Sequence, residues 1–224
     1  MNKKYVIFKD DDVGKDFDSL KRWIDIVLKN NAKAAIGLIG KHMKDKDLVS
    51  YLKKLDNNKI EVFCHGYSHN HFPYIVMKFF GRNRLFPTEF DRNKRLHDLS
   101  LKKYRKAEKQ FLKNKAITFG PQGNIWNESL IEPLEKNGFK LMFSWDKING
   151  DIFTIPLTDN YRQNTLDEFI NMYKKNKEKE IYTLQFHHAK LTDVQFDLMS
   201  DVIEYLKNKE KRIFIKPSEL LKIS

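Results

Sequence analysis

The sequence predicts an α/β protein built on a largely parallel sheet, because short apolar segments of strand length alternate along the chain with longer amphipathic segments. Acidic and imidazole side chains follow three of the predicted strands, where parallel α/β proteins carry their active sites. No internal repeat and no long linker interrupts this alternation. We therefore expect a single domain over residues 1–224.

The first strand is predicted at 5–8, where Tyr-Val-Ile-Phe forms a buried apolar run that ends in acidic residues. The first helix is expected at 19–30, because Leu20, Trp23 and Val27 recur at helical spacing. The remaining strands are expected at 34–40, 60–65, 116–120, 139–144, 151–157, 181–188 and 212–217. The remaining helices are expected at 47–55, 98–114, 127–137, 165–175 and 193–208.

Composition limits the class of protein. Of the 224 residues 41% are hydrophobic, which is enough for a buried core and too much for a disordered chain. The single cysteine, Cys64, excludes a disulfide within the chain and is typical of a reducing compartment. The apolar run at 5–8 is shorter than the roughly 7–15 residues of a signal peptide or the about 20 of a membrane span. We expect a cytoplasmic protein without a transmembrane segment.

The net charge of +12 is unevenly distributed. Residues 78–115 hold thirteen Lys or Arg and four Asp or Glu, and such a segment attracts anions. A solvated helix face is the simpler interpretation of 98–115. Nucleic-acid binding is disfavoured, because no Gly-rich loop, zinc-finger spacing or RNP-like motif accompanies the charge. An anionic sugar carrier, or peripheral contact with a membrane that presents one, is the partner we expect.

Three consecutive aspartates, Asp10, Asp11 and Asp12, follow the first predicted strand in the segment FKDDDVG. Adjacent carboxylates repel one another, so a compact arrangement requires a cation or a proton nearby. The alternative is an exposed acidic loop in which one aspartate caps the following helix. The aspartates alone leave both interpretations open.

A histidine pair, His65 and His69, follows the predicted strand at 60–65 with the spacing H-x-x-x-H. The zinc-protease interpretation of this spacing fails, because Gly66 stands where the protease has glutamate and the segment follows a strand. In a loop the two imidazoles can still converge on one ion, and two histidines with one carboxylate leave coordination positions for water. The alternative is a pair of loop histidines bonded to backbone; the neighbouring acidic strand end favours the metal.

These motifs, together with the loop GPQGN and a late strand that ends in His-His, resemble the polysaccharide deacetylases, the NodB-homology proteins of carbohydrate esterase family 4. The form FKDDDVG with HGYSH resembles the divergent branch linked to O-antigen and capsule synthesis. The resemblance covers residues 5–221. It implies a distorted (β/α) barrel in one domain and one divalent metal ion, with zinc as the default.

The resemblance also implies roles for the residues of the first two motifs. Asp11 corresponds to the catalytic base of the family and Asp12 to its metal-binding aspartate, although the register could be argued one residue either way. His65 and His69 correspond to the two histidine ligands.

The late strand offers His187 as the counterpart of the catalytic histidine. His188 is its competitor, because a shift of one residue moves the other side chain to the site face. The third family motif, R-P-P-Y-G, aligns with residues 119–123 but lacks the arginine, which in the family orients the catalytic aspartate. A Lys or Arg from 78–95 is the substitute we consider. The substrate-binding residues expected on this basis are Pro121, Gln122, Gly123, Trp145 and His188.

The implied function is that of a metal-dependent hydrolase that removes an N-acetyl or related acyl group from an amino sugar in O-antigen or other surface polysaccharide synthesis. The lack of an export signal favours a nucleotide- or lipid-linked acetamido sugar as substrate. Two alternatives stay open: an amidase acting on another small amide, and a catalytically inactive carbohydrate-binding homologue, which the missing arginine makes conceivable.

Overall fold

The computed structural model describes residues 3–68 and 94–223, and all structural statements refer to these. His69 and most of the segment 78–95 lie outside the described residues. Contacts divide the chain into two compact units. The first comprises residues 1–37, 54–62 and 155–224, and the second comprises residues 38–53 and 63–154. The single domain expected from the sequence stays a prediction.

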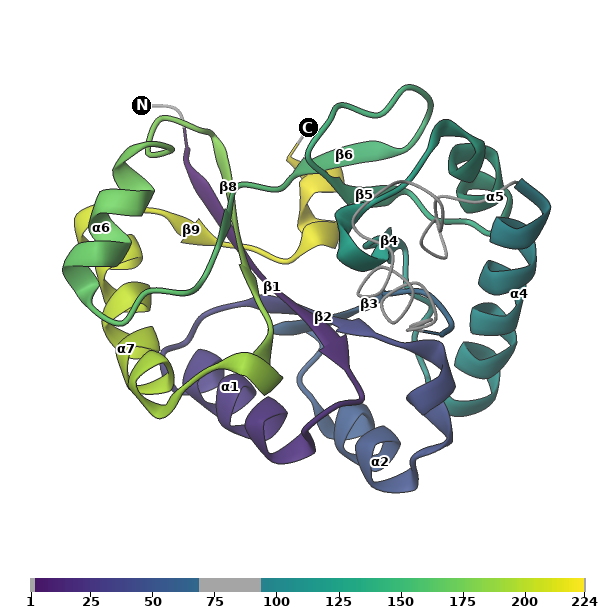
Figure 1. The fold of residues 1–224 in the computed structure, drawn as a ribbon, viewed down its shortest axis with the longest axis horizontal. Helices are drawn as coiled ribbons and strands as arrows, with labels where there is room; N and C mark the ends of the chain where they lie inside the picture. Colours follow the sequence, from purple (N-terminus) through teal and green to yellow (C-terminus); the bar gives the residue numbers. More distant parts are fainter. Residues whose placement is uncertain (1–2, 69–93, 224) are drawn as a thin grey trace, which may run out of the picture. The chain divides into compact units, whose positions relative to one another are not determined.

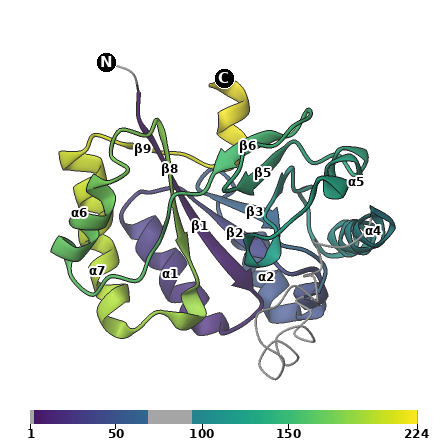
Figure 2. The ribbon, with the colours of Figure 1, turned by 45° about the horizontal axis from the view of Figure 1, so that its top comes forward.

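The first unit is built around β1, which pairs in parallel with both β8 and β9 (Figure 1). Its strands are β1 (Tyr5–Val13), most of β2 (Ala34–Leu38) and β3 (Ile60–Cys64), β7 (Asp159–Asn160), β8 (Ile181–Phe186) and β9 (Ile213–Phe214). Its helices are α1 (Phe17–Lys29), α6 (Leu166–Lys174) and α7 (Asp193–Glu204). The strand order here is β3-β2-β1-β8-β7. Figure 2 shows α1, α6 and α7 along these strands.

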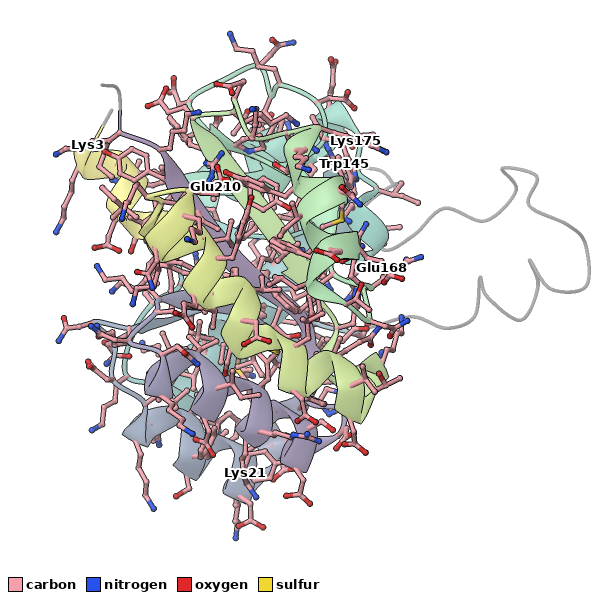
Figure 3. All side chains as sticks on the ribbon, turned by 90° about the vertical axis from the view of Figure 1, so that its left-hand side faces the viewer. Lys3, Lys21, Trp145, Glu168, Lys175 and Glu210 are labelled. Atoms are coloured by element: carbon pink, nitrogen blue, oxygen red, sulfur yellow. The ribbon has the colours of Figure 1, made fainter. Side chains whose placement is uncertain are left out.

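The core of the first unit lies between one face of the β1–β8 pair and α1. The ring of Phe8 on β1 lies 4.9 Å from that of Phe186 on β8, measured between centroids. Trp23 of α1, fully buried, packs edge-on against Phe186 with centroids 5.4 Å apart. Charged side chains such as Lys21 extend outward from the same helix (Figure 3). This is the amphipathic pattern that the helical spacing predicts.

Arg212 ties the end of the chain to its beginning within this unit. Its guanidinium donates hydrogen bonds to the Tyr5 carbonyl at 2.9 Å and to the Tyr173 hydroxyl at 2.7 Å. It also donates to the carbonyls of Lys177 and Lys179. Arg212 is only 3% exposed. These hydrogen bonds therefore compensate both the buried guanidinium charge and the buried carbonyl groups for the loss of contact with water.

In the second unit, β4 lies between the end of β3 and β5. The strands of this unit are β4 (Thr118–Phe119), β5 (Leu141–Ser144) and the start of β6 (Phe153–Pro156). Its helices are most of α2 (Lys46–Lys54), α4 (Lys94–Phe111) and α5 (Ile131–Lys136). Cys64 pairs with Phe119, and Phe119 pairs with Met142, both in parallel register. The rings of Phe63 on β3 and Phe143 on β5 lie 5.1 Å apart, measured between centroids.

Each strand and helix expected from the sequence is present, and the parallel α/β class is confirmed. The bounds differ most at β1, which was expected at 5–8 and instead continues to Val13. The three aspartates therefore lie within a strand rather than in a loop after it, at 0%, 2% and 7% exposure in chain order. Among the described helices, none has the length and apolar character needed to cross a bilayer.

Candidate active site

Each aspartate of β1 lies beside a different cationic group of the first unit. The carboxylate–cation pairs are Asp10 with His188 at 2.6 Å, Asp11 with Lys9 at 2.5 Å and Asp12 with Lys15 at 3.1 Å. The repulsion among the three adjacent carboxylates is therefore offset by side chains of the protein itself. The acidic run alone therefore does not require a bound ion. The alternative of an exposed acidic loop is wrong, because the three aspartates are buried in a strand, whereas the ion site stays a prediction.

His188 is a fully enclosed partner of Asp10. Its backbone N–H and its Nδ1 donate to the two oxygens of the Asp10 carboxylate, at 2.9 and 2.6 Å. Its Nε2 lies 2.6 Å from the carbonyl oxygen of Lys15, which can only accept, so both ring nitrogens carry protons. Burial lowers the pKa of His188, but Asp10 and the Lys15 carbonyl raise it more, to about 8. The imidazolium thus connects the end of β8 to β1 and to the turn that follows it.

The opposite face of the β1–β8 pair carries Lys9, Asp11, Gln185 and His187. Lys9 and Gln185 are direct partners in the parallel register, and side chains two residues apart on a strand share a face. The paired register ends at Asp10 and Phe186, and Asp11 and His187 each follow directly after that last pair. Burial lowers the pKa of the half-buried His187, and the Asp11 carboxylate is the strongest of the charges that oppose this lowering. A carboxylate therefore lies near an imidazole whose pKa is lowered.

Lys9 is the residue of this face that sequence reasoning missed. Its side chain is fully buried, and its Nζ donates to Asp11 Oδ2 at 2.5 Å and to Gln185 Oε1 at 3.1 Å. Burial lowers the pKa of the Lys9 ammonium, and the Asp11 carboxylate partly offsets this lowering. The signal in the sequence was a lysine inside an apolar strand, two residues before an aspartate, because that spacing places both side chains on one face.

Asp12 stands apart from its neighbours because the backbone changes direction there. Its φ is 66°, in the left-handed region that aspartate adopts more readily than most residues. Lys15 closes the turn, its backbone N–H donating to the Asp12 carbonyl at 3.3 Å and its Nζ to the Asp12 carboxylate. Strand alternation therefore stops at Asp12, and its carboxylate has surroundings different from those of Asp10 and Asp11.

In the second unit, His65 is held in one tautomer by the loop after β4. Its Nδ1 lies 2.8 Å from the carbonyl oxygen of Gly120, so Nδ1 carries the proton and the lone pair of the neutral ring is on Nε2. A Cβ on Gly120 would lie 2.6 Å from the Phe63 ring, so only glycine brings this carbonyl so close. The Gln122 amide donates to the backbone carbonyl of His65 at 2.9 Å, which fixes the same loop from the other side.

The other residues expected to bind substrate differ in exposure. Pro121 and Gln122 are buried, whereas Gly123 is exposed and adopts a φ of 64°. Trp145 directly follows β5 and is 50% exposed (labelled in Figure 3). The buried Ser144 before it accepts a hydrogen bond from the Trp126 indole at 3.0 Å. An exposed indole on a fixed strand end is a suitable surface for stacking on a sugar ring.

The predicted metal ligands are distributed over different parts of the chain: Asp12 in the first unit, His65 in the second, and His69 outside the described residues. Within residues 3–68 and 94–223 no group of three His, Cys, Asp or Glu side chains is placed to hold an ion. The donor chemistry nevertheless fits a divalent ion, because a histidine with Nδ1–H bonded to a backbone carbonyl is the usual form of a metal-binding imidazole. The shared ion stays a prediction.

Several solved structures with a similar fold are described as carbohydrate esterases of family 4 or as a putative polysaccharide deacetylase. A putative polysaccharide deacetylase from Mycobacterium smegmatis is 10% identical, with a TM-score of 0.71, over 100% of this chain and 91% of that one. A family 4 acetyl xylan esterase from Clostridium thermocellum, in complex with a cobalt ion, is 15% identical, with a TM-score of 0.66, over 98% and 91%. The predicted fold class, a distorted (β/α) barrel of the polysaccharide deacetylase type, is confirmed.

A third similar structure is a family 4 pseudoenzyme from Bacillus anthracis, 16% identical with a TM-score of 0.66 over 95% of this chain. The chain spans 63% of the length of that protein. Among curated proteins, none matches the sequence. The sequence model of glycosyl hydrolase family 57 matches residues 5–223. The expected resemblance to polysaccharide deacetylases therefore holds for the fold, whereas by its sequence the chain belongs to glycosyl hydrolase family 57.

Proposed function

We propose that the protein is a hydrolase that removes an N-acetyl or related acyl group from an amino sugar. The observation that carries this proposal is the shared face of β1 and β8, where Asp11 and His187 follow the Lys9–Gln185 pair. Amide hydrolysis needs a base to activate water and an acid to protonate the departing nitrogen, and these two side chains can supply both. The fold likeness to carbohydrate esterases and a putative deacetylase supports the same reaction class.

In this mechanism water attacks the acyl carbon, a C–O bond forms and the C–N bond breaks. Asp11, as a carboxylate, accepts a proton from the attacking water. His187, in its protonated form, donates a proton to the departing amine, without which an amide nitrogen does not leave. The products are acetate and the free amino sugar. Because burial lowers the pKa of His187, its protonated form is a stronger acid than an ordinary imidazolium.

We propose Asp12, His65 and His69 as the ligands of one divalent ion, with zinc as the default. The support is the tautomer of His65. Because Nδ1–H donates to the Gly120 carbonyl, the lone pair of the ring is on Nε2, where it can bind a metal ion. When bound, such an ion lowers the pKa of water toward roughly 7 and polarises the acyl carbonyl. The backbone N–H near Gln122 remains the proposed donor to the developing oxyanion.

The proposed substrate is a nucleotide- or lipid-linked acetamido sugar of O-antigen or other surface polysaccharide synthesis, handled in the cytoplasm. The net charge of +12 supports an anionic substrate, because it raises the local concentration of anions. The half-exposed Trp145 supports a sugar, since an indole face stacks on pyranose rings.

The experiment measures acetate released from UDP-N-acetylglucosamine and from N,N′,N″-triacetylchitotriose, with and without EDTA, followed by zinc readdition. Acetate release that EDTA stops and zinc restores is the expected result. Asp11→Asn should stop turnover and keep the metal content, whereas Asp12→Ala should lose the metal. A carbohydrate-binding homologue would bind the sugar by calorimetry and release no acetate in any condition. Metal content and activity both retained by Asp12→Ala would contradict the ligand set.

Glycoside hydrolysis is the second candidate, and the family match favours it. That reaction uses two carboxyl groups about 5–5.5 Å or about 6.5–9.5 Å apart, one of them protonated. On β1 each of the three carboxylates lies beside a cationic group of the protein, so none of them forms a simple carboxyl pair with a neighbour. New reducing ends from N,N′,N″-triacetylchitotriose without acetate would establish the glycosidase and refute the deacetylase.

A further inference from the structure

We infer that Lys9 is a positioning residue for Asp11: its buried ammonium, anchored on Gln185 of the neighbouring strand, fixes the carboxylate in the orientation needed to accept a proton. The inference rests on the proposed role of Asp11 as base. Lys9 contacts the Oδ2 atom of Asp11, so it acts on the reaction through the orientation of that carboxylate.

The geometry around Lys9 makes the ammonium a fixed point. Its Nζ lies 2.5 Å from Asp11 Oδ2 and 3.1 Å from Gln185 Oε1, one partner on each of two paired strands. The Cα atoms of Lys9 and Gln185 are in register, and both residues are at most 4% exposed. A lysine at the surface samples many rotamers, whereas this one is enclosed along its whole stem.

Fixing one oxygen of the Asp11 carboxylate fixes the direction of the other. Asp11 has two side-chain dihedral angles, and the contact of Oδ2 with Lys9 removes most of that freedom. A general base must lie within hydrogen-bond reach of the proton it removes, and a displacement of about 1 Å can lower a rate by about 100-fold. The ammonium therefore acts on the rate through the orientation of Asp11.

A purely structural ion pair is the simpler account of the same contacts. A buried charge needs a partner, and replacing a buried pair with apolar residues is often neutral for stability. That account predicts that changes at Lys9 alter unfolding and leave the turnover of folded protein unchanged. The two accounts therefore differ in kcat and in the conformation of Asp11.

The variants follow from the strand register. Lys9→Met removes the ammonium and keeps the apolar stem. The exchange Lys9→Gln with Gln185→Lys returns an ammonium and an amide to the same two paired positions, with the charge now on β8. Thr183→Val is the control, because Thr183 is fully buried on the same face of β8 and pairs with Ile7, two residues before Lys9. Each variant is assayed for acetate release and for unfolding in urea, and its crystal structure is compared with that of the wild type.

We expect Lys9→Met to lower kcat by about 100-fold with KM changed by less than about threefold, which is the signature of a lost transition-state interaction. The exchange variant should recover kcat to within about tenfold of the wild type, and Thr183→Val should keep it. In the crystal structures the Asp11 carboxylate should move in Lys9→Met and return in the exchange variant. Wild-type kcat in folded Lys9→Met would overturn the inference.

The remaining outcomes are also decisive. If Lys9→Met does not fold, the exchange variant decides, because a kcat that stays about 100-fold low in folded protein contradicts a positioning role. If the wild type releases no acetate, the proposed function is wrong. The orientation of Asp11 in the Lys9→Met and exchange crystals then still tests Lys9, and an unmoved carboxylate refutes it.

Discussion

Replacing His188 with glutamine removes a buried cation whose contribution to stability depends on pH in a defined direction. The folded pKa of His188 is about 8, against 6.5 for an ordinary histidine, because Asp10 and the Lys15 carbonyl outweigh the effect of burial. A group with a raised folded pKa stabilises fully below its unfolded pKa and loses that contribution as pH rises through the folded value. The difference between these two values corresponds to about 2 kcal/mol.

The assay is urea unfolding of wild type and His188→Gln at pH 5.5 and pH 9.5, chosen to bracket both pKa values. The excess stability of the wild type should be about 2 kcal/mol larger at pH 5.5 than at pH 9.5. His187→Gln is the matched control, since burial lowers the pKa of His187. Its wild-type histidine should therefore cost stability as pH falls below 6.5, the opposite sign. Equal stability differences at both pH values for His188→Gln would refute the imidazolium–carboxylate pair.

Three further substitutions test other parts of the structure. Arg212→Met should lower the free energy of unfolding by about 3 kcal/mol or more, measured in urea, because it leaves buried carbonyls without a donor. Gly120→Ala should cost about 1–3 kcal/mol and reduce bound zinc measured by mass spectrometry, since its Cβ meets the Phe63 ring at 2.6 Å. Trp145→Ala should raise KM with unfolding changed by less than about 0.5 kcal/mol; an unchanged KM would exclude stacking.

The sequence predicted the elements of the fold because parallel strands are buried on both faces and read as continuous apolar runs. The same rule misplaced the end of β1. Asp10, Asp11 and Asp12 interrupt the apolar run at residue 8, so the strand was expected to stop there. The strand continues to Val13 because each carboxylate has a cation beside it, and a paired charge tolerates burial that an isolated one does not.

The partners of these aspartates were predictable to different degrees. Lys9 lies two residues from Asp11, so period-two spacing could have suggested the pair. His188 is 178 positions from Asp10, and nothing local indicates which strand neighbours β1 or in which register. The choice between His187 and His188 has the same origin, since alternation places them on opposite faces but only the β1–β8 register shows what each face contains.

The register also explains how adjacent aspartates can have unlike roles. Alternation directs Asp10 to the face that packs on α1, where Phe186 contacts Trp23 and where a charged side chain must be fully paired. It directs Asp11 to the opposite face, which also carries His187. Asp12 follows neither rule because its left-handed backbone ends the alternation. One buried strand therefore supplies an aspartate that secures the strand end, one placed to act as a base and one placed at the turn. An insertion of one residue before Asp10 would turn the Asp10 side chain to the opposite face and break its pairing with His188.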